Sequence, residues 1–73
     1  MVRVYPNPGN GKLNVRATAD VKKLQFVNLT GSLVHSQPFA KVVDVSFLQP
    51  GIYFLRAINN DNETVSAQKI VIR

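Results

Sequence analysis

The residues of this sequence that are able to carry out acid–base chemistry are few, and they form no known motif. The 73-residue chain contains one histidine, His35, and four acidic residues, Asp20, Asp44, Asp61 and Glu63. General acid–base catalysis needs titratable groups held at a defined spacing, and a catalytic triad needs a serine, a histidine and a carboxylate together. No such set can be assembled here without an arbitrary choice of residues. The sequence therefore predicts that the protein is not an enzyme.

A cluster of side-chain oxygens at 59–63 is the nearest approach to a metal site. Calcium takes about six to eight oxygen ligands, and this segment reads Asn59-Asn60-Asp61-Asn62-Glu63. The segment lacks the EF-hand spacing with its central glycine, and consecutive Asn and Asp residues are typical of hairpin turns. The chain also has no cysteine, which excludes a disulfide and a thiolate metal site. We therefore expect a turn at 59–63 and neither a metal nor a cofactor.

The chain is basic, with nine Lys and Arg residues against four Asp and Glu residues, a net charge of +5 and an isoelectric point near 10.1. This balance favours anionic partners such as nucleic acids, lipid headgroups or acidic polysaccharides without choosing among them. The basic residues are scattered apart from Lys22-Lys23, which is typical of a solvated surface. Nucleic-acid binding would interleave exposed aromatic and basic residues, and only Phe54 with Arg56 comes close. We therefore expect no nucleic-acid partner.

No segment of the sequence is expected to insert into a membrane. A run of about eighteen apolar residues, which a spanning helix needs, does not occur, and the first residues lack the apolar core of a signal peptide. If the native protein is exported, its export signal lies outside this chain. The chain is then expected to be a fragment of a longer precursor.

Short apolar runs separated by turn residues predict an all-β fold. The turns recur about every eight to twelve residues, a spacing typical of an all-β sandwich or barrel. Seven strands are expected, at 2–5, 12–16, 23–28, 33–36, 42–46, 52–58 and 64–73. Strict alternation points every second side chain inward, and the expected inward residues of the second, third and fifth strands are Leu13, Val15, Leu24, Phe26, Val43 and Val45.

The turn signals are proline and glycine residues between these strands. Pro6 and Pro8 are expected to stop the first strand, and Asn10-Gly11 is a strong hairpin signal because both residue types tolerate positive φ. Gly31 is the expected positive-φ residue of a tight turn at 29–32.

The stretch Leu48-Gln49-Pro50-Gly51-Ile52-Tyr53-Phe54-Leu55-Arg56 is a corner that leads into the most apolar strand. Pro50 and Gly51 end one strand and aim the next. Tyr53 is expected to bury its ring and return its hydroxyl to upstream backbone, the tyrosine corner of β-sandwiches. The strand places Tyr53, Leu55 and Ala57 on one face, and Ile52, Phe54, Arg56 and Ile58 on the other. Such a strand is either central in its sheet or covered from outside the domain.

Five motifs of the chain, taken together, resemble one family closely. They are Val4-Tyr5-Pro6-Asn7-Pro8, Gly11-Lys12-Leu13, Leu29-Thr30-Gly31-Ser32-Leu33-Val34, the corner from Leu48 to Arg56, and Lys69-Ile70-Val71-Ile72. In this order and spacing they resemble the type A C-terminal sorting domain of the type IX (Por) secretion system of Bacteroidetes. The resemblance covers essentially the whole chain, and its motifs are specific in combination although each alone is weak.

The resemblance implies a single domain over 1–73, folded as an immunoglobulin-like antiparallel β-sandwich of about seven strands at the C-terminus of a larger cargo protein. The precursor would reach the periplasm by a Sec signal and be recognised by the outer-membrane translocon. A sortase-like protease would then remove the domain at the cell surface, commonly coupling the cargo to anionic lipopolysaccharide. The cleavage site would lie upstream of this chain.

The family positions carried over to this sequence are expected to be mainly structural. They are Tyr5, Pro6, Asn7, Pro8, Gly31, Pro50, Gly51 and Tyr53. Two departures stand beside them, because Ser32 replaces a common basic residue and Asn28 a common aspartate. Translocon recognition is expected to rest on the terminal strand, whose edge would allow strand addition. Its residues are Lys69, Ile70, Val71, Ile72 and Arg73, and the outward residues Ile52, Phe54 and Arg56 are further contact candidates.

A different class of function remains as an alternative. The domain would then be a permanent β-sandwich accessory module that binds polysaccharide or protein for a secreted enzyme. In either case an exposed edge strand would also allow weak self-association.

Overall fold

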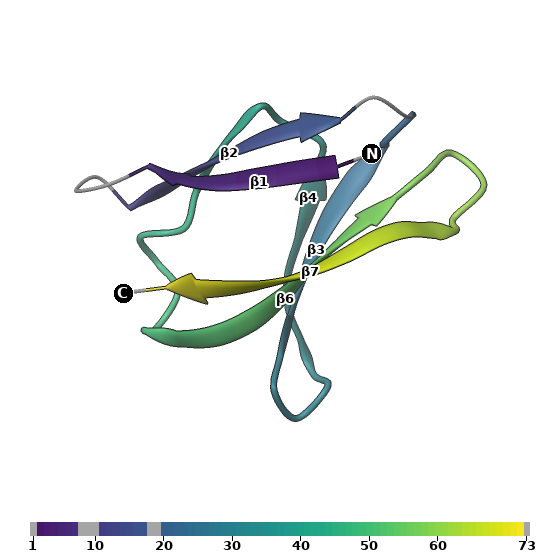
Figure 1. Ribbon diagram of the computed structural model, residues 1–73. Coiled ribbons are helices and arrows are strands. Elements are labelled where there is room, and N and C mark those ends of the chain that lie inside the picture. Colours follow the sequence, from purple (N-terminus) through teal and green to yellow (C-terminus); the bar gives the residue numbers. More distant parts are fainter. Residues whose placement is uncertain (1, 8–10, 18–19, 73) are drawn as a thin grey trace.

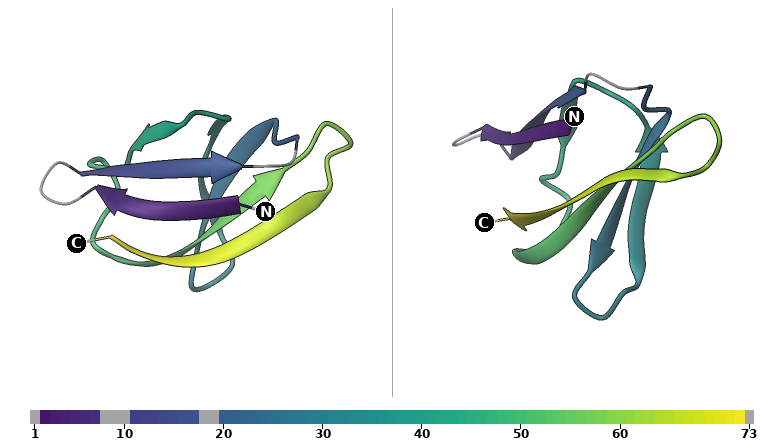
Figure 2. Two further views of the ribbon diagram at one scale, coloured as in Figure 1. Left: turned by 45° about the horizontal axis from the view of Figure 1, so that its top comes forward. Right: turned by 45° about the vertical axis from the view of Figure 1, so that its right-hand side comes forward.

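The computed structural model describes residues 2–7, 11–17 and 20–72, and within them all regular structure is β-strand (Figure 1). The strands are β1 (Val2–Asn7), β2 (Lys12–Ala17), β3 (Lys23–Asn28), β4 (Leu33–Pro38), β5 (Val42–Asp44), β6 (Gly51–Ile58) and β7 (Thr64–Ile72). They form two antiparallel sheets, with the strand orders β1-β2-β5 and β4-β3-β6-β7. The sheets face each other as two layers (Figure 2). This confirms the predicted all-β, immunoglobulin-like sandwich.

The described chain passes from one sheet to the other after β2, after β4 and after β5. Because the sheets alternate along the sequence, each obtains its apolar partner face only when the other is in place. β6 lies between β3 and β7. A central position in the sheet, one of the two explanations expected for its apolar faces, is therefore confirmed.

The hydrophobic core lies between the two sheets and follows the predicted alternation. Its buried residues are Val2, Leu13, Val15, Val43 and Val45 on the side of the three-stranded sheet, and Leu24, Phe26, Tyr53, Leu55, Ala57, Ile70 and Ile72 on the other side. All six residues that the second, third and fifth strands were expected to turn inward are buried. Full burial of such a side chain stabilises the fold by about 1.5–3 kcal/mol. In a chain without cysteine, this core carries most of the stability.

The first strand is longer than the sequence predicts. The expectation that Pro6 stops it is wrong, because β1 continues to Asn7 and Pro6 pairs with Leu13. β1 is an edge strand, and a proline is tolerated at an edge because its missing N–H can face away from the neighbouring strand. Pro8, which was also expected to act here, lies outside the described residues.

Other strand ends differ from the prediction by one or two residues. β5 ends at Asp44 and not at Ser46. The reason is a local turn, in which Asp44 Oδ1 accepts hydrogen bonds from the backbone N–H and the hydroxyl of Ser46 at 2.9 and 2.6 Å. Side chains of this kind compete with the sheet for backbone groups.

The prediction that Ile58 faces outward with Ile52, Phe54 and Arg56 is wrong. Ile58 is buried, with 3% of its surface exposed. The pairing of β6 with β7 shifts register between Ala57 and Ile58, and such a bulge breaks the strict alternation of side chains.

Gly11 holds the beginning of β2 against the segment after β5. Its φ is +67°, and a Cβ built on it would lie 3.0 Å from Cβ of Ser46. Its carbonyl accepts a hydrogen bond from the N–H of Val45 at 2.8 Å. The predicted hairpin between β1 and β2 is present, while Asn10 lies outside the described residues.

β1 and β7 are the edge strands on the same side of the sandwich (Figures 1 and 2), and a side-chain contact connects them. The amide of the Gln68 side chain donates a hydrogen bond to the carbonyl of Val2. This contact joins residues from opposite ends of the sequence and fixes β1 next to β7.

The predicted tyrosine corner is present. Tyr53 is buried, with 8% of its surface exposed, and its hydroxyl donates a hydrogen bond of 2.6 Å to the carbonyl of Gln49. The bond spans Pro50 and Gly51, where the chain leaves one sheet and starts the central strand of the other. It therefore fixes the direction in which β6 begins.

Replacing Tyr53 tests the corner. Tyr53→Ala should cost about 3–5 kcal/mol because it removes a buried aromatic ring, a large part of the stability of a domain. Tyr53→Phe keeps the ring and should cost about 1–3 kcal/mol because the Gln49 carbonyl loses its donor. Urea unfolding followed by circular dichroism measures both. The control Tyr5→Phe alters a tyrosine that is 40% exposed and should cost less than about 0.5 kcal/mol; equal stability of Tyr53→Ala and wild type would contradict the corner's role.

The turn between β3 and β4 depends on Asn28. Gly31 has φ +87°, as the sequence predicts, and its N–H donates to the Asn28 carbonyl at 3.0 Å. The side-chain Oδ1 of Asn28 accepts three hydrogen bonds, from the N–H of Thr30 at 3.1 Å, its hydroxyl at 2.8 Å and the N–H of Ser32 at 2.9 Å. An aspartate offers the same acceptor oxygen, so the family's common residue would serve the turn equally well.

Substitutions of Asn28 distinguish the role of its acceptor oxygen Oδ1 from that of its side-chain amide nitrogen. Asn28→Ala should destabilise the domain by about 1–2 kcal/mol because two backbone N–H groups and a hydroxyl lose their acceptor. Asn28→Asp keeps the acceptor and should stay within about 0.5 kcal/mol of wild type. Thermal unfolding of the three proteins at neutral pH compares them. If Asn28→Asp were as damaging as Asn28→Ala, the amide nitrogen and not Oδ1 would be the important group.

Candidate functional site

Most motif residues that are far apart in the sequence meet at one end of the sandwich. Strand pairing places Gly51 opposite Ile72 and Asn28 opposite Tyr53. β1 runs in the same direction as β7, so the C-terminal ends of both strands lie at this end of the sandwich (Figure 1). We call this region, bounded by Asn7, Asn28, Gly51 and Ile72, the corner end. Sequence reasoning missed this convergence, because it depends on how β1 and β7 lie across the two sheets.

The N-terminal motif contributes one exposed aromatic side chain to the molecule. Tyr5 lies on the outer face of the three-stranded sheet, and its hydroxyl accepts a hydrogen bond from Nη1 of Arg3 at 3.2 Å. Pro6 and Asn7 take part in β1 through their pairing with Leu13 and Lys12.

The terminal strand divides into buried and exposed residues. Ile70 and Ile72 are part of the core, whereas Lys69 and Val71 are exposed. Arg73, the last residue of the expected recognition segment, lies outside the described residues. β7 is at the edge of the four-stranded sheet, as expected, and among the described strands it pairs only with β6.

Exposed apolar side chains lie next to this edge on the outer face of the four-stranded sheet. Ile52 and Phe54 are each 37% exposed and Val71 is 50% exposed. Ile52 is the direct cross-strand partner of Val71, so the side chains share a face. We call Ile52, Phe54 and Val71 the outer apolar patch. It adjoins Lys69, the cross-strand partner of Phe54.

Arg56 lies on the same outer face, further along β6. It is half-buried, and its Nε makes no hydrogen bond to the described residues. Its direct cross-strand neighbours are Gln25 and Ala67. Among the outward residues proposed for contact, Arg56 is thus less available than Ile52 and Phe54.

His35 packs at the side of the sandwich where β4 lies. Its ring is 5.8 Å from the ring of Phe26 and 4.8 Å from that of Phe47, centroid to centroid. Its Nε2 is 2.9 Å from Oε1 of Gln37. These contacts show that His35 packs against two aromatic side chains.

Two side-chain oxygens of the 59–63 turn, those of Asn59 and Glu63, are used within the turn itself. Oδ1 of Asn59 accepts hydrogen bonds from the N–H groups of Asp61 and Glu63, both at 2.9 Å. Nδ2 of Asn59 donates to Oε1 of Glu63 at 3.2 Å. Within residues 2–7, 11–17 and 20–72, no group of three or more His, Cys, Asp and Glu side chains is placed to hold a metal ion. The arrangement therefore explains the cluster as a hairpin turn.

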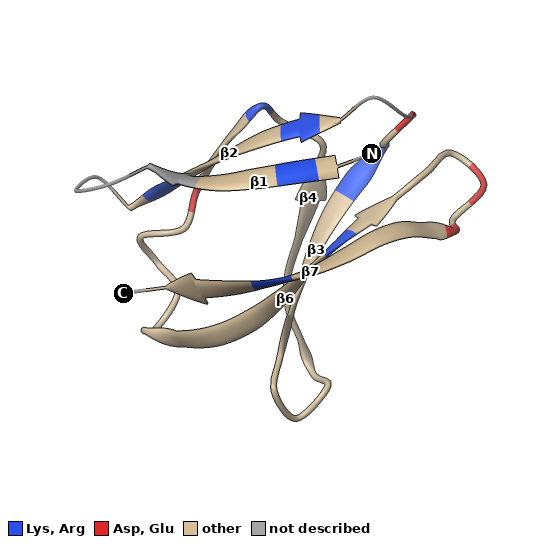
Figure 3. Ribbon diagram, in the orientation of Figure 1, with Lys and Arg blue, Asp and Glu red and all other residues tan. Residues whose placement is uncertain are grey.

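Charge is distributed unevenly over the molecule. Figure 3 shows Lys and Arg on several strands, while acidic residues at 20, 61 and 63 lie in loops. In the described part of the chain, no helix is long and apolar enough to span a membrane. What the site offers to a partner is an edge strand, an apolar patch and basic side chains.

Comparison with known proteins identifies the family. The family model described as the secretion system C-terminal sorting domain matches residues 3–73. A search of curated proteins finds no match. The family match spans nearly the whole chain, and the family is one of sorting signals and not of enzymes. The chain therefore belongs to the family of type IX secretion C-terminal sorting domains, which are the sorting signals that direct cargo proteins into this secretion route.

Proposed function

We propose that the outer-membrane translocon recognises this domain by adding a strand to the free edge of β7 near the corner end. The observation that carries the proposal is the position of β7, an edge strand with exposed Lys69 and Val71 alternating with buried Ile70 and Ile72. An edge strand presents unused backbone N–H and C=O groups, and main-chain pairing with a partner strand uses them. The proposal retains 69–73 as the recognition segment.

The alternation along β7 gives its residues two different roles. The buried residues anchor the strand in the core, and the exposed residues are available to contact a partner. Ile70 and Ile72 pack into the core and keep the strand extended, so a partner would meet a preformed edge. A preformed edge lowers the ordering cost of binding. Lys69 and Val71 would then give side-chain selectivity on the outer face.

The outer apolar patch enlarges this contact. Ile52 and Phe54 lie on the strand next to β7 and share its outer face with Val71. Burial of apolar surface contributes about 25 cal/mol per Å². A partner that pairs with β7 and covers this patch would gain both main-chain and apolar contacts.

The wider pathway is part of the same proposal. The chain is the C-terminal domain of a longer cargo, which passes through the periplasm and reaches the cell surface or the medium. A sortase-like protease removes the domain upstream of the N-terminal motif. The family match supports this pathway over a permanent accessory module, and mass spectrometry of the mature surface protein distinguishes them, because retention of the domain would contradict removal.

Surface display of a reporter fused in front of residues 1–73 tests recognition by β7. The double variant Lys69→Glu, Val71→Glu reverses the charge and removes the apolar contact at the corner end. It should lower display about tenfold, which corresponds to a loss of ~1.4 kcal/mol of binding. The control Thr64→Glu, Val65→Glu also introduces two carboxylates, at the other end of β7, and should leave display unchanged; it lowers the net charge by about two units where the test variant lowers it by about three.

Substitution is preferable to trimming the strand, because deletion of residues 69–73 also removes Ile70 and Ile72 from the core. Thermal unfolding of the isolated variants checks that both double variants fold. If the folded Lys69→Glu, Val71→Glu protein is displayed as well as wild type, the C-terminal end of β7 is not the recognition segment.

A further inference from the structure

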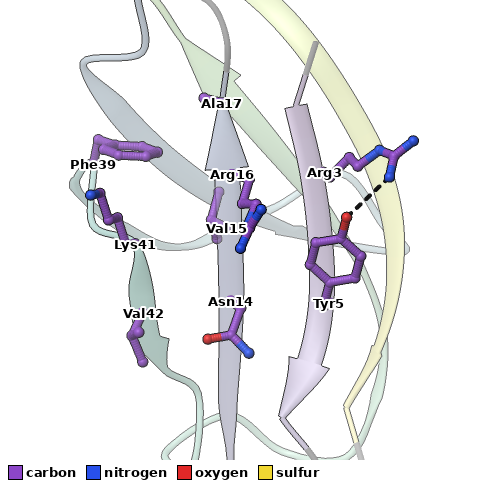
Figure 4. Close-up of a pocket in the computed structure, with 9 residues that line it drawn as sticks. All are labelled: Arg3, Tyr5, Asn14, Val15, Arg16, Ala17, Phe39, Lys41 and Val42. Atoms are coloured by element: carbon purple, nitrogen blue, oxygen red, sulfur yellow. Dashed lines mark hydrogen bonds between the residues drawn. The ribbon is translucent and has the colours of Figure 1, made fainter.

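The outer face of the three-stranded sheet carries a row of positive charges. Arg3 of β1 is the direct cross-strand partner of Arg16 of β2, and both are exposed. On the other side of β2, the N–H of Val15 donates to the carbonyl of Lys41 at 2.8 Å. The side chains of Arg3, Arg16 and Lys41 together line one open groove (Figure 4).

Arg3 and Arg16 occupy directly opposite backbone positions, while the Arg3 guanidinium extends away from Arg16 to the Tyr5 hydroxyl (Figure 4). Like charges at directly opposite positions of an antiparallel pair destabilise it. The acidic residue of this sheet, Asp44, is opposite Lys12 and is not part of the groove. Hydrogen bonds from the Ser46 hydroxyl and N–H, with a smaller effect of the Lys12 charge, hold the pKa of Asp44 below its usual value. Asp44 is therefore ionised but engaged elsewhere.

The next row across the same face has a different chemistry. Tyr5 pairs with Asn14, and Asn14 pairs with Val42. Tyr5 is 40% exposed. Its hydroxyl accepts the hydrogen bond from Arg3, which holds a guanidinium group beside the ring (Figure 4). The groove thus combines cations, one amide and an aromatic face.

We propose that this groove binds an acidic polysaccharide whose sugar units carry carboxylates. A guanidinium group binds a carboxylate through two parallel hydrogen bonds. The Asn14 amide is able both to donate to and to accept from sugar hydroxyls, and the C–H face of a sugar ring packs on an exposed aromatic ring such as Tyr5. An open groove across a sheet accommodates a chain better than a compact ligand.

The composition of the groove favours this partner over other polyanions. Single-stranded nucleic acids bind on successive aromatic platforms, whereas the two aromatic residues of this groove, exposed Tyr5 and partly buried Phe39, lie on opposite sides of β2 (Figure 4). An acidic peptide would also satisfy the cations, so poly-L-glutamate is the comparison ligand that separates the two partners in a titration. The groove lies on the opposite sheet from the outer apolar patch, so this binding is separate from recognition by β7.

The test is titration of the domain with alginate oligosaccharide, a polymer of uronic acids, at about 0.15 M salt, where long-range attraction is screened. Wild type should bind alginate and not neutral dextran. Arg16→Gln and Tyr5→Ala should each weaken binding about tenfold, as expected for loss of a charge-assisted contact or of the stacking surface. The control Lys69→Gln makes the same charge change on the other sheet and should bind like wild type.

Two further measurements decide between specific and general attraction. Poly-L-glutamate should bind more weakly than alginate, and its binding should not depend on Tyr5. Arg16→Gln should also raise the melting temperature of the free domain slightly, since it removes one of two like charges at directly opposite backbone positions. Equal loss of alginate binding in Lys69→Gln and Arg16→Gln, or alginate binding that is unaffected by Tyr5→Ala, would overturn the proposal while leaving the sorting function untouched.

Discussion

The hydrogen bond from the Tyr53 hydroxyl to the Gln49 carbonyl is the contact on which the rest of the sandwich depends. It closes the corner where the chain crosses from β5 to β6. β6 then pairs with β3 on one side and with β7 on the other, so its starting direction sets the position of both neighbours. The end of β7, opposite Gly51, is placed by the same corner. The architecture of the corner therefore also fixes the position of the proposed recognition segment.

The small size of the chain makes the fold more dependent on the corner at Tyr53. A domain of about this length hides only some 60% of the surface of its unfolded chain, and this one has no disulfide to compensate. The terminal strand consequently serves two purposes, since Ile70 and Ile72 are part of the core while Lys69 and Val71 are exposed. The proposed recognition at β7 therefore requires a folded domain. A substitution of Tyr53 would thus weaken the proposed recognition indirectly, by disturbing the position of β7, although Tyr53 itself is buried.

The sequence predicts local structure well and long-range placement poorly. Alternation identified Leu24 and Phe26 as core residues, the glycine at 31 marked a positive-φ turn, and Tyr53 marked the corner, because each depends on neighbours in the chain. Pro6 was misjudged because its tolerance depends on β1 being an edge strand, which pairing across the sheet decides. The cross-strand pairing of Arg3 with Arg16 could not be predicted either, because the strand register decides which of the scattered charged residues are neighbours.

Strand register also explains why basic residues that are scattered along the sequence lie on two chemically different surfaces, one on each sheet. On one sheet Lys69 adjoins apolar side chains, an environment for a protein partner that buries hydrophobic area. On the other sheet Arg3 and Arg16 adjoin Tyr5 and Asn14, an environment for a polar, charged chain. The net charge of +5 is a property of the whole chain, so it does not distinguish the surface of one sheet from that of the other. Because electrostatic attraction alone sets association rates more than specificity, the discrimination between partners must come from the neutral residues that each sheet places beside its cations.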